Sequence, residues 1–248
     1  MKCKMILLAV LSTMSLYAQQ HGDAKIFAIS KNVEIEMIWI EPGSFLMGSP
    51  DNELERNATR EKQHAVTLTK GFWIAKTETS QKTWESVMKD NPSKIQGSDL
   101  PVEQVSWNRA QEFIRKINKN GARFRLPYEA EWEYACRAGS TTAYAGRRDQ
   151  MTWHSGNSNR TTHAVGSKTA NAWGLFNMHG NVSEMCLDWF QEDISELTID
   201  SKGPATGERR VERGGQYTGR IRHTRSADRS SNVPDGSSFF VGFRLVHD

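Results

Sequence analysis

Cysteine is scarce in this sequence: three are present among 248 residues, and they form no CxxC motif and no cluster with histidine. Structural zinc and copper sites are built from such clusters of sulfur and nitrogen donors, so a transition-metal centre of this kind is not expected. Cys3 lies near the N-terminus, which leaves Cys136 and Cys186 in the body of the chain. These two form either a disulfide, which an oxidising compartment would permit, or two separate buried thiols.

An excess of charge of either sign is also missing. The chain has 32 Lys and Arg residues against 29 Asp and Glu residues, which gives a formal net charge of +3. Without Lys2 and Lys4 the two counts become 30 and 29. A balance this close to neutral gives no electrostatic reason to expect nucleic acid or a membrane surface as a partner.

Long apolar runs are absent outside the N-terminus. Residues 1–20, MKCKMILLAVLSTMSLYAQQ, contain two lysines, an apolar run that starts at Met5 and continues in part to Ala18, and then polar residues. This pattern predicts a secretory signal peptide cleaved near Ala18, and the run is too short for a transmembrane span. A lipid anchor is disfavoured because Cys3 precedes the apolar run. We therefore expect an exported protein that is periplasmic, cell-surface or secreted.

Aromatic residues are plentiful, with eight Trp and ten Phe, and a chain of this length can bury them in the core of a single domain. We expect a short tail over residues 21–32 and one domain over residues 33–248. Glu129, Glu131 and Glu133 are interpreted as electrostatics of a helix start rather than as catalytic acids. The patterns predict strands within residues 33–48 and 65–78, and helices after a cap at Thr79 or Ser80, after the cap Ser106 and after Leu126-Pro127. They also predict a solvated charged loop over residues 51–63 and a long loop over residues 139–168 that packs on residues 171–190.

Glycines, aromatics and oxygen donors are concentrated in residues 171–190, NAWGLFNMHGNVSEMCLDWF. That composition is typical of an ordered irregular loop rather than of a regular helix or strand. It contains an amide oxygen, two backbone carbonyls and a carboxylate at a spacing that can converge on a hard cation such as calcium. The alternative is a turn in which the Asn and Glu side chains cap backbone N–H groups. The four positions are Asn177, Gly180, Val182 and Glu184.

Five segments, taken in order, resemble the motifs of the formylglycine-generating enzyme, or sulfatase-modifying factor, superfamily. They are EPGSFLMGSP (41–50), LPVEQVSWNRAQEF (100–113), FRLPYEAEWEYACRAG (124–139), residues 171–190, and the stretch from RVERGG (210–215) to NVPDGSSFFVGFRLV (232–246). The match runs from about Val33 to the C-terminus. The resemblance implies a single α+β domain of the C-type-lectin-like kind, with short strands, few helices and much irregular structure. It also implies structural calcium at the four positions named above.

The same resemblance makes the C-terminal segment informative about catalysis. In this family two cysteines of the segment bind copper and drive oxidation of a sulfatase cysteine by molecular oxygen, because a thiolate pair suits a soft Cu(I) ion. The corresponding positions here are approximately Gly219 and Ile221. Gln216 stands in place of a Ser that follows the Gly-Gly pair, and Ser183 stands in place of a Trp. We therefore expect no bound copper and a non-catalytic binding module.

Two alternatives to a binding module remain open. One is a formylglycine-generating oxidase with relocated chemistry that acts on a sulfatase cysteine. The other is a structural component of a cell-envelope machine, which the signal peptide and the implied fold would also suit.

A ligand is expected at the C-terminal loops, residues 216–225 and 234–241. Arg220 and Arg222 alternate as they would on a strand, and such arginines can bind carboxylate, sulfate or phosphate groups through bidentate contacts. Pairing of the arginines with Asp228, Asp235 and Glu212 inside the protein is an equal alternative. An aromatic contact patch would form if Phe240 were exposed beside Tyr217. The predicted partner is a protein or a small anionic ligand, bound by Gln216, Tyr217, Arg220, Arg222, Arg225, Ser237 and Phe240.

Overall fold

The computed structural model describes residues 19–248, so the predicted signal peptide lies outside the described residues except for its last two positions. The strands are β1 (Ala24–Ser30), β2 (Val33–Ile40), β3 (Gly43–Met47), β4 (His64–Leu68), β5 (Phe72–Ala75), β6 (Phe124–Arg125), β7 (Thr152–Trp153), β8 (His179–Gly180), β9 (Ser183–Trp189), β10 (Arg210–Arg213), β11 (Arg229–Asn232), β12 (Val241–Gly242) and β13 (Val246–His247). The helices are α1 (Gln81–Met88), α2 (Trp107–Ile117), α3 (Glu129–Arg137) and α4 (Arg148–Met151), with the short 3₁₀ helices η1 (Asn118–Asn120) and η2 (Ile221–Thr224).

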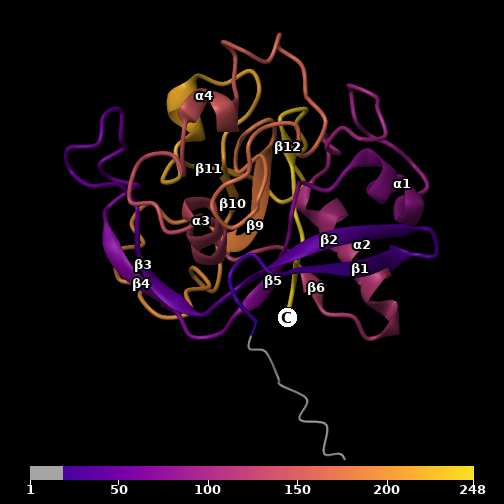
Figure 1. Ribbon diagram of the computed structural model, residues 1–248, viewed down its shortest axis with the longest axis horizontal. Helices are drawn as coiled ribbons and strands as arrows, with labels where there is room; N and C mark the ends of the chain where they lie inside the picture. Colours follow the sequence, from indigo (N-terminus) through magenta and orange to yellow (C-terminus); the bar gives the residue numbers. More distant parts are fainter. Residues whose placement is uncertain (1–18) are drawn as a thin grey trace, which may run out of the picture.

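Two sheets organise the domain (Figure 1). The larger has the order β1-β2-β5-β13-β6, and all of its neighbouring strands are antiparallel. The smaller has the order β11-β10-β9-β12, in which β12 runs parallel to β9. Because β12 belongs to one sheet and β13 to the other, the last eight residues of the chain join the two sheets. The predicted α+β fold with short strands and few helices is confirmed.

The larger sheet separates two apolar clusters, because alternate side chains of a strand point to opposite faces. On β5, Trp73 and Ala75 belong to the cluster that contains α1 and α2, whereas Phe72 and Ile74 belong to the cluster that contains α3. All four residues of β5 are buried, as expected for a strand covered on both faces. The elements that carry the C-terminal loops are therefore fixed by aromatic and aliphatic packing on both faces of this sheet.

Both predicted cap residues begin a helix. The Ser80 side chain accepts a hydrogen bond from the Thr83 backbone N–H at the start of α1, and Ser106 does the same for Arg109 in α2. The two helices pack through stacked rings, with the centroids of Trp84 and Phe113 5.5 Å apart. The helix predictions from periodicity and capping are confirmed.

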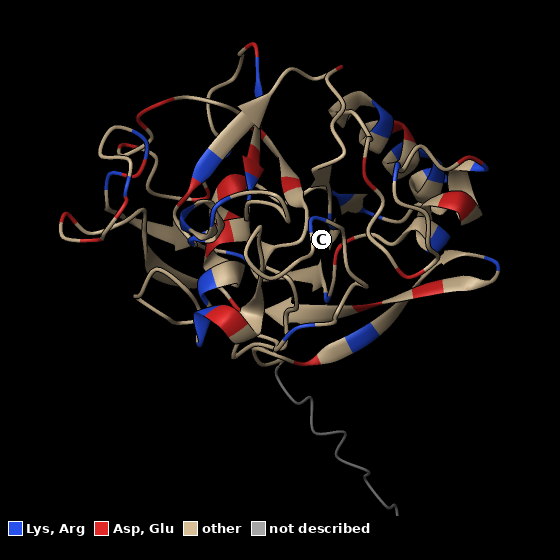
Figure 2. Ribbon diagram, turned by 90° about the horizontal axis from the view of Figure 1, so that it is seen from above, with Lys and Arg blue, Asp and Glu red and all other residues tan. Residues whose placement is uncertain are grey.

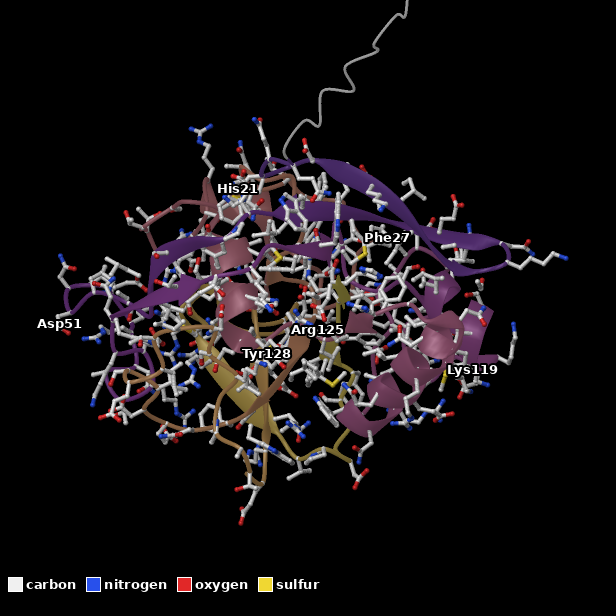
Figure 3. The ribbon with its side chains drawn as sticks, turned by 90° about the horizontal axis from the view of Figure 1, so that it is seen from below. His21, Phe27, Asp51, Lys119, Arg125 and Tyr128 are labelled. Atoms are coloured by element: carbon white, nitrogen blue, oxygen red, sulfur yellow. The ribbon has the colours of Figure 1, made fainter. Side chains whose placement is uncertain are left out.

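The predicted tail over residues 21–32 is wrong, because residues 24–30 form the edge strand β1 and pair with β2. Phe27 anchors this strand, with its ring centroid 5.6 Å from that of Trp73 and 6.0 Å from that of Phe124 (Figure 3). Upstream of β1, His21 stacks on Trp173 at a centroid distance of 3.9 Å. The strand was missed because an edge strand with one exposed face shows only a few apolar residues among polar ones.

Of the α3 glutamates, which the sequence suggests are helix-start charges, Glu131 accepts a hydrogen bond from the Tyr128 backbone N–H at 2.8 Å, whereas Glu129 and Glu133 are buried partners of arginines. Glu133 is fully buried and pairs with Arg137 at 2.7 Å and also with Arg213, which is itself fully buried. Glu129 accepts hydrogen bonds from Arg229 at 2.6 and 2.8 Å. Two arginines of the smaller sheet are thus paired with α3, and the pairing fixes the helix against that sheet.

Charges at the surface are mixed in sign, and Figure 2 shows basic and acidic segments interspersed along the ribbon. Arg125, whose side chain is mostly buried, lies against the ring of Tyr128 at 5.0 Å (Figure 3) and contacts Asp248 at 2.7 Å. Within residues 19–248, no helix combines the length and the apolar character needed to cross a bilayer.

Replacement of Arg213 by Met should lower the free energy of unfolding by about 3 to 5 kcal/mol, because it removes one of the arginine partners from each of two buried carboxylates, Glu129 and Glu133. Urea unfolding monitored by tryptophan fluorescence measures this loss. The control is Lys116→Met, which breaks a half-exposed pair with Glu112 at 3.1 Å and should change stability by less than about 0.5 kcal/mol. Equal losses in the two variants would contradict a structural role for the buried pairs.

Candidate functional site

The C-terminal segment turns sharply after β10. Gly214 and Gly215 have φ angles of +89° and +67°, a region that favours glycine. A Cβ at position 215 would lie 2.2 Å from the backbone oxygen of His223, so glycine is required where the chain passes under η2. The prediction that Arg220 and Arg222 lie on a strand is wrong, because residues 221–224 form this 3₁₀ helix.

This turn and the smaller sheet enclose a cleft with a volume of about 260 Å³, which we call the C-terminal cleft. Its walls come from the edges of β9 to β12 and from the loop after β10. It is lined by Ser183, Glu212, Gly215, Gln216, Gly219, His223, Asp228, Ser230, Ser231, Asn232, Ser238, Phe240 and Val241. Most of these side chains carry a hydroxyl, an amide or a carboxyl group, so the cleft is suited to polar contacts.

The predicted ligand-binding residues are only partly brought together. Gln216 and Phe240 line the C-terminal cleft, whereas Ser237 and Arg220 are exposed outside its lining. Tyr217 is 3% exposed, and its ring packs beneath Phe240 at a centroid distance of 5.7 Å. The aromatic pair therefore belongs mostly to the core, with the half-buried Phe240 as the member that reaches the cleft.

Arg225 lies inside the protein, in agreement with the alternative that the arginines pair with carboxylates internally. Its guanidinium contacts Glu61 at 2.6 and 2.8 Å and Glu53 at 2.7 Å. Both partners come from residues 51–63, a segment that is mostly exposed, as predicted, but that turns these two carboxylates inward. The side chain is 2% exposed, and its donors are committed to these carboxylates.

The charge of the C-terminal cleft is acidic or neutral rather than basic. Among the described residues that line it there are two carboxyl groups, Glu212 and Asp228, and neither Lys nor Arg. His223 lies between Arg222, whose Nε is 3.1 Å from its Nε2, and Asp228, whose Oδ1 is 3.5 Å from its Nδ1. Because Arg222 can only donate, Nε2 must accept, and the neutral ring therefore carries its proton on Nδ1, facing Asp228.

Glu212 is the titratable group at the base of the cleft. It is 8% exposed, and burial raises its pKa to about 7, although hydrogen bonds from neighbouring side chains oppose the shift. Ser230 faces it across the β10–β11 pair, with Oγ 3.3 Å from the carboxylate. Near neutral pH this group can therefore either donate or accept a hydrogen bond.

The four expected cation ligands are buried, but they are not equally free to bind an ion. The carboxylate of Glu184 accepts two hydrogen bonds of 2.6 Å from Arg244 and one of 2.7 Å from Trp132. Asn177 is 3% exposed, and its Oδ1 has no hydrogen-bond partner among the described residues. The expected set thus fits calcium only in part, since Asn177 offers an open oxygen while Glu184 is occupied by Arg244.

A carboxylate that the sequence did not indicate lies beside Asn177. Glu78 follows β5, and its Oε1 accepts hydrogen bonds from Asn177 at 3.2 Å and from Asn181 at 2.9 Å. Burial raises its pKa to about 7, while Arg244 acts in the opposite direction. Nearly one hundred residues separate Glu78 from Asn177, so no local spacing could have revealed the contact. Across residues 19–248, no group of three or more His, Cys, Asp and Glu side chains is arranged to hold a metal.

Cys136 and Cys186 are both buried and free, so they do not form a disulfide. The Cys136 sulfur lies 3.7 Å from His179 Nε2, and burial raises the pKa of this thiol to about 12. Neither cysteine lines the C-terminal cleft, whereas Gly219 does. The neighbour of Gly219 in the cleft is the Gln216 side chain, whose amide group would lie 3.7 Å from a Cβ atom at position 219.

Two packed sheets, short helices and long ordered loops define a single α+β domain of the kind found in formylglycine-generating enzymes. The chain belongs to the sulfatase-modifying factor enzyme 1-like domain family, which matches residues 24–248. The resemblance inferred from the five segments is thereby confirmed. The family match also begins before Val33, in agreement with the position of β1.

Similar proteins include an enzyme and two solved structures. The formylglycine-generating enzyme of Streptomyces coelicolor is 40% identical over 174 residues, which cover 60% of this chain and 52% of that enzyme. Variable protein 1 of Treponema denticola has a TM-score of 0.82 at 27% identity, over 90% of this chain and 98% of that one. PvdO from Pseudomonas aeruginosa has a TM-score of 0.83 at 26% identity, over 93% and 100%. The match thus spans about half the length of the curated enzyme.

The raised pKa of Glu212 predicts a pH-dependent stability. The folded-state pKa of about 7 lies above the ordinary value of 4.5, so protonated Glu212 contributes stability that is complete below pH 4.5 and lost as pH rises through 7. The change amounts to about 3 kcal/mol. Urea unfolding between pH 5 and 8 should therefore show a steeper decline for the wild type than for Glu212→Gln.

The matched control for this pH dependence is Glu34→Gln, which changes an exposed carboxylate on β2. It should reproduce the wild-type pH dependence. Parallel curves for Glu212→Gln and the wild type would show that Glu212 does not titrate in this range.

Proposed function

We propose that this protein is a non-catalytic, ligand-binding member of the family and that the C-terminal cleft is its binding site. The observation that carries the proposal is the lining of this cleft, which consists mostly of hydroxyl, amide and carboxyl groups and includes Gly219, one of the two positions to which the resemblance assigns a copper-binding thiol. Thiolate and thioether ligands are the ones that a soft Cu(I) ion prefers. The two remaining cysteines are core residues and are not part of this lining.

The volume and charge of the cleft indicate the class of ligand. Pockets for drug-sized molecules typically measure about 300 to 1,000 Å³, so a cleft of about 260 Å³ suits a smaller group, such as one side chain of a partner protein. Glu212 and Asp228 favour a cationic or hydrogen-bond-donating group over the anionic one expected from the sequence. We therefore propose that the cleft receives a lysine or arginine side chain of a partner protein.

Export and structural calcium complete this proposal. A signal peptide would place the protein outside the cytoplasm, where calcium modules commonly work at millimolar affinity. Calcium near Asn177 would stabilise the loop over residues 171–190, and that loop supports one end of the cleft through the hydrogen bond from Tyr217 N–H to the Asn181 carbonyl at 2.8 Å. Calcium would thus act on the site indirectly.

A formylglycine-generating oxidase is the second candidate, and the 40% identity to the Streptomyces coelicolor enzyme favours it. Such an enzyme would need to recruit its copper ligands from outside the C-terminal cleft. Cys136 would have to leave its buried position beside His179 to take part. The binding function requires no such rearrangement.

The two candidates differ in their response to copper. We expect no tight Cu(I) binding and no oxygen consumption with a cysteine-containing sulfatase peptide, because the cleft offers no thiolate pair. A competition assay with a chromogenic Cu(I) chelator and an oxygen electrode measure the two quantities. Activity that survives in the double variant Cys136→Ser, Cys186→Ser would contradict the proposal, since it would have to arise without any thiol of the domain.

The ligand class is tested with a small cationic probe. Titration of the protein with N-acetyl-lysine amide should shift the amide NMR signals of Gly215 and Ser230, whereas inorganic phosphate should leave them unchanged. Asp228→Asn should weaken the effect at least about tenfold, because a hydrogen bond to a charged group contributes about 1.5 to 3 kcal/mol. The exposed Asp235→Asn serves as the control. Shifts with phosphate that centre on Arg220 and Arg222 would instead support the anionic ligand.

A further inference from the structure

Two buried oxygen atoms near the loop over residues 171–190 lack any hydrogen-bond partner among the described residues: Oδ1 of Asn177 and Oε2 of Glu78. The two residues are 3% and 2% exposed. Their side chains already face each other, because Asn177 Nδ2 donates to Glu78 Oε1 at 3.2 Å. Each of the two groups in contact therefore keeps one acceptor oxygen to which no described residue donates, an arrangement that is costly unless a cation, a proton or another donor lies there.

The hydrogen bonds around Glu78 favour its ionised form. Its Oε1 accepts from both Asn177 and Asn181, and two such donors stabilise a carboxylate. Arg244 is close enough to influence Glu78 electrostatically, but its own donors are directed elsewhere. The remaining oxygen of Glu78 therefore lies in a cluster that holds two carboxyl groups, those of Glu78 and Glu184, and the guanidinium group of Arg244.

Glu184, the carboxylate implied as a ligand by the family resemblance, is engaged in holding Arg244. From there Arg244 donates to the carbonyls of Ala75 at 3.0 Å and Phe176 at 2.9 Å. These carbonyls lie just before Glu78 and just before Asn177 in the chain. The Glu184–Arg244 pair thereby holds in place the two segments that carry the unpartnered oxygens. Glu184 therefore positions the site through Arg244.

We propose that Glu78 rather than Glu184 supplies the carboxylate that binds calcium, with Asn177 Oδ1 as the second side-chain ligand. This inference rests on the calcium proposal above and names its ligands. Gly180 and Val182 keep the carbonyl roles implied by the resemblance. A carboxylate, an amide oxygen and carbonyls form a set of hard oxygen donors, which suits calcium better than zinc.

The experiment compares calcium binding by the wild type and by Glu78→Gln. The variant keeps an acceptor for Asn181 and gains an N–H group that can donate to Asn177 Oδ1, so it should fold. Isothermal titration with calcium chloride should show binding to the wild type and at least about 100-fold weaker binding to Glu78→Gln, since even loss of an outer-shell partner costs about 10- to 100-fold. Calcium, compared with EDTA, should raise the thermal unfolding midpoint of the wild type but not that of Glu78→Gln.

Glu103→Gln is the matched control. Glu103 is also fully buried and also has an unpartnered Oε2, but its other oxygen accepts from the backbone of Lys94 and Ile95, far from Asn177 in the chain. It should retain the wild-type response to calcium. As a second variant, Asn177→Asp should bind calcium more tightly than the wild type, because a carboxylate replaces the amide ligand.

The outcomes separate the two proposals. Wild-type calcium binding that persists in folded Glu78→Gln would overturn the assignment of Glu78 while leaving calcium in place. No calcium in the wild type by titration and elemental analysis would overturn both, and would leave a proton shared between Glu78 and Asn177 as the neutralising charge. Neither result decides which ligand the C-terminal cleft binds, which is tested by the cationic probe.

Discussion

Buried arginine–glutamate pairs hold this domain together. Each arginine comes from the C-terminal third of the chain, and the partners come from the loop over residues 51–63, from α3 and from β9. The pairs are Arg213 with Glu133, Arg225 with Glu61, Arg229 with Glu129, and Arg244 with Glu184. A domain with much irregular backbone has many carbonyl groups without a place in a helix or sheet, and a guanidinium group has five donors with which to satisfy them. Arg229, for example, also donates to the carbonyls of Arg60, Gln191 and Glu192.

This use of arginine changes what the C-terminal segment can bind. A run of arginines between glycines suggests an anion site when it is read as a sequence. The fold instead turns Arg213, Arg225 and Arg229 inward, where their charges are matched. The groups left to face the cleft are carboxyls, hydroxyls and amides, so the structural role of arginine determines the polarity of the candidate site.

Features set by neighbouring residues could be predicted from the sequence, and features set by distant residues could not. Ser80 and Ser106 begin helices because their side chains cap backbone groups three residues away, and such local geometry is visible in a pattern. The partner of Arg225 is 164 residues away, and that of Asn177 is 99 residues away. Nothing in the local sequence distinguishes Glu61 or Glu78 from an exposed glutamate. The positions of Gln216 and Phe240 at the cleft followed from the resemblance, whereas its acidic lining needed the tertiary structure.

The scaffold and the chemistry of the cleft are physically separable. The loop that carries Gly219 is held by the Gly214-Gly215 turn and by the hydrogen bond from Tyr217 to Asn181, and neither involves a thiol. The 3₁₀ helix that contains Ile221 is tied in by Tyr144, whose hydroxyl donates to the Ile221 carbonyl at 2.9 Å. Side chains at positions 219 and 221 can therefore change without loss of a buried pair. A fold stabilised in this way can exchange a metal-binding pair for a polar lining, because the contacts that determine stability lie beneath the site rather than in it.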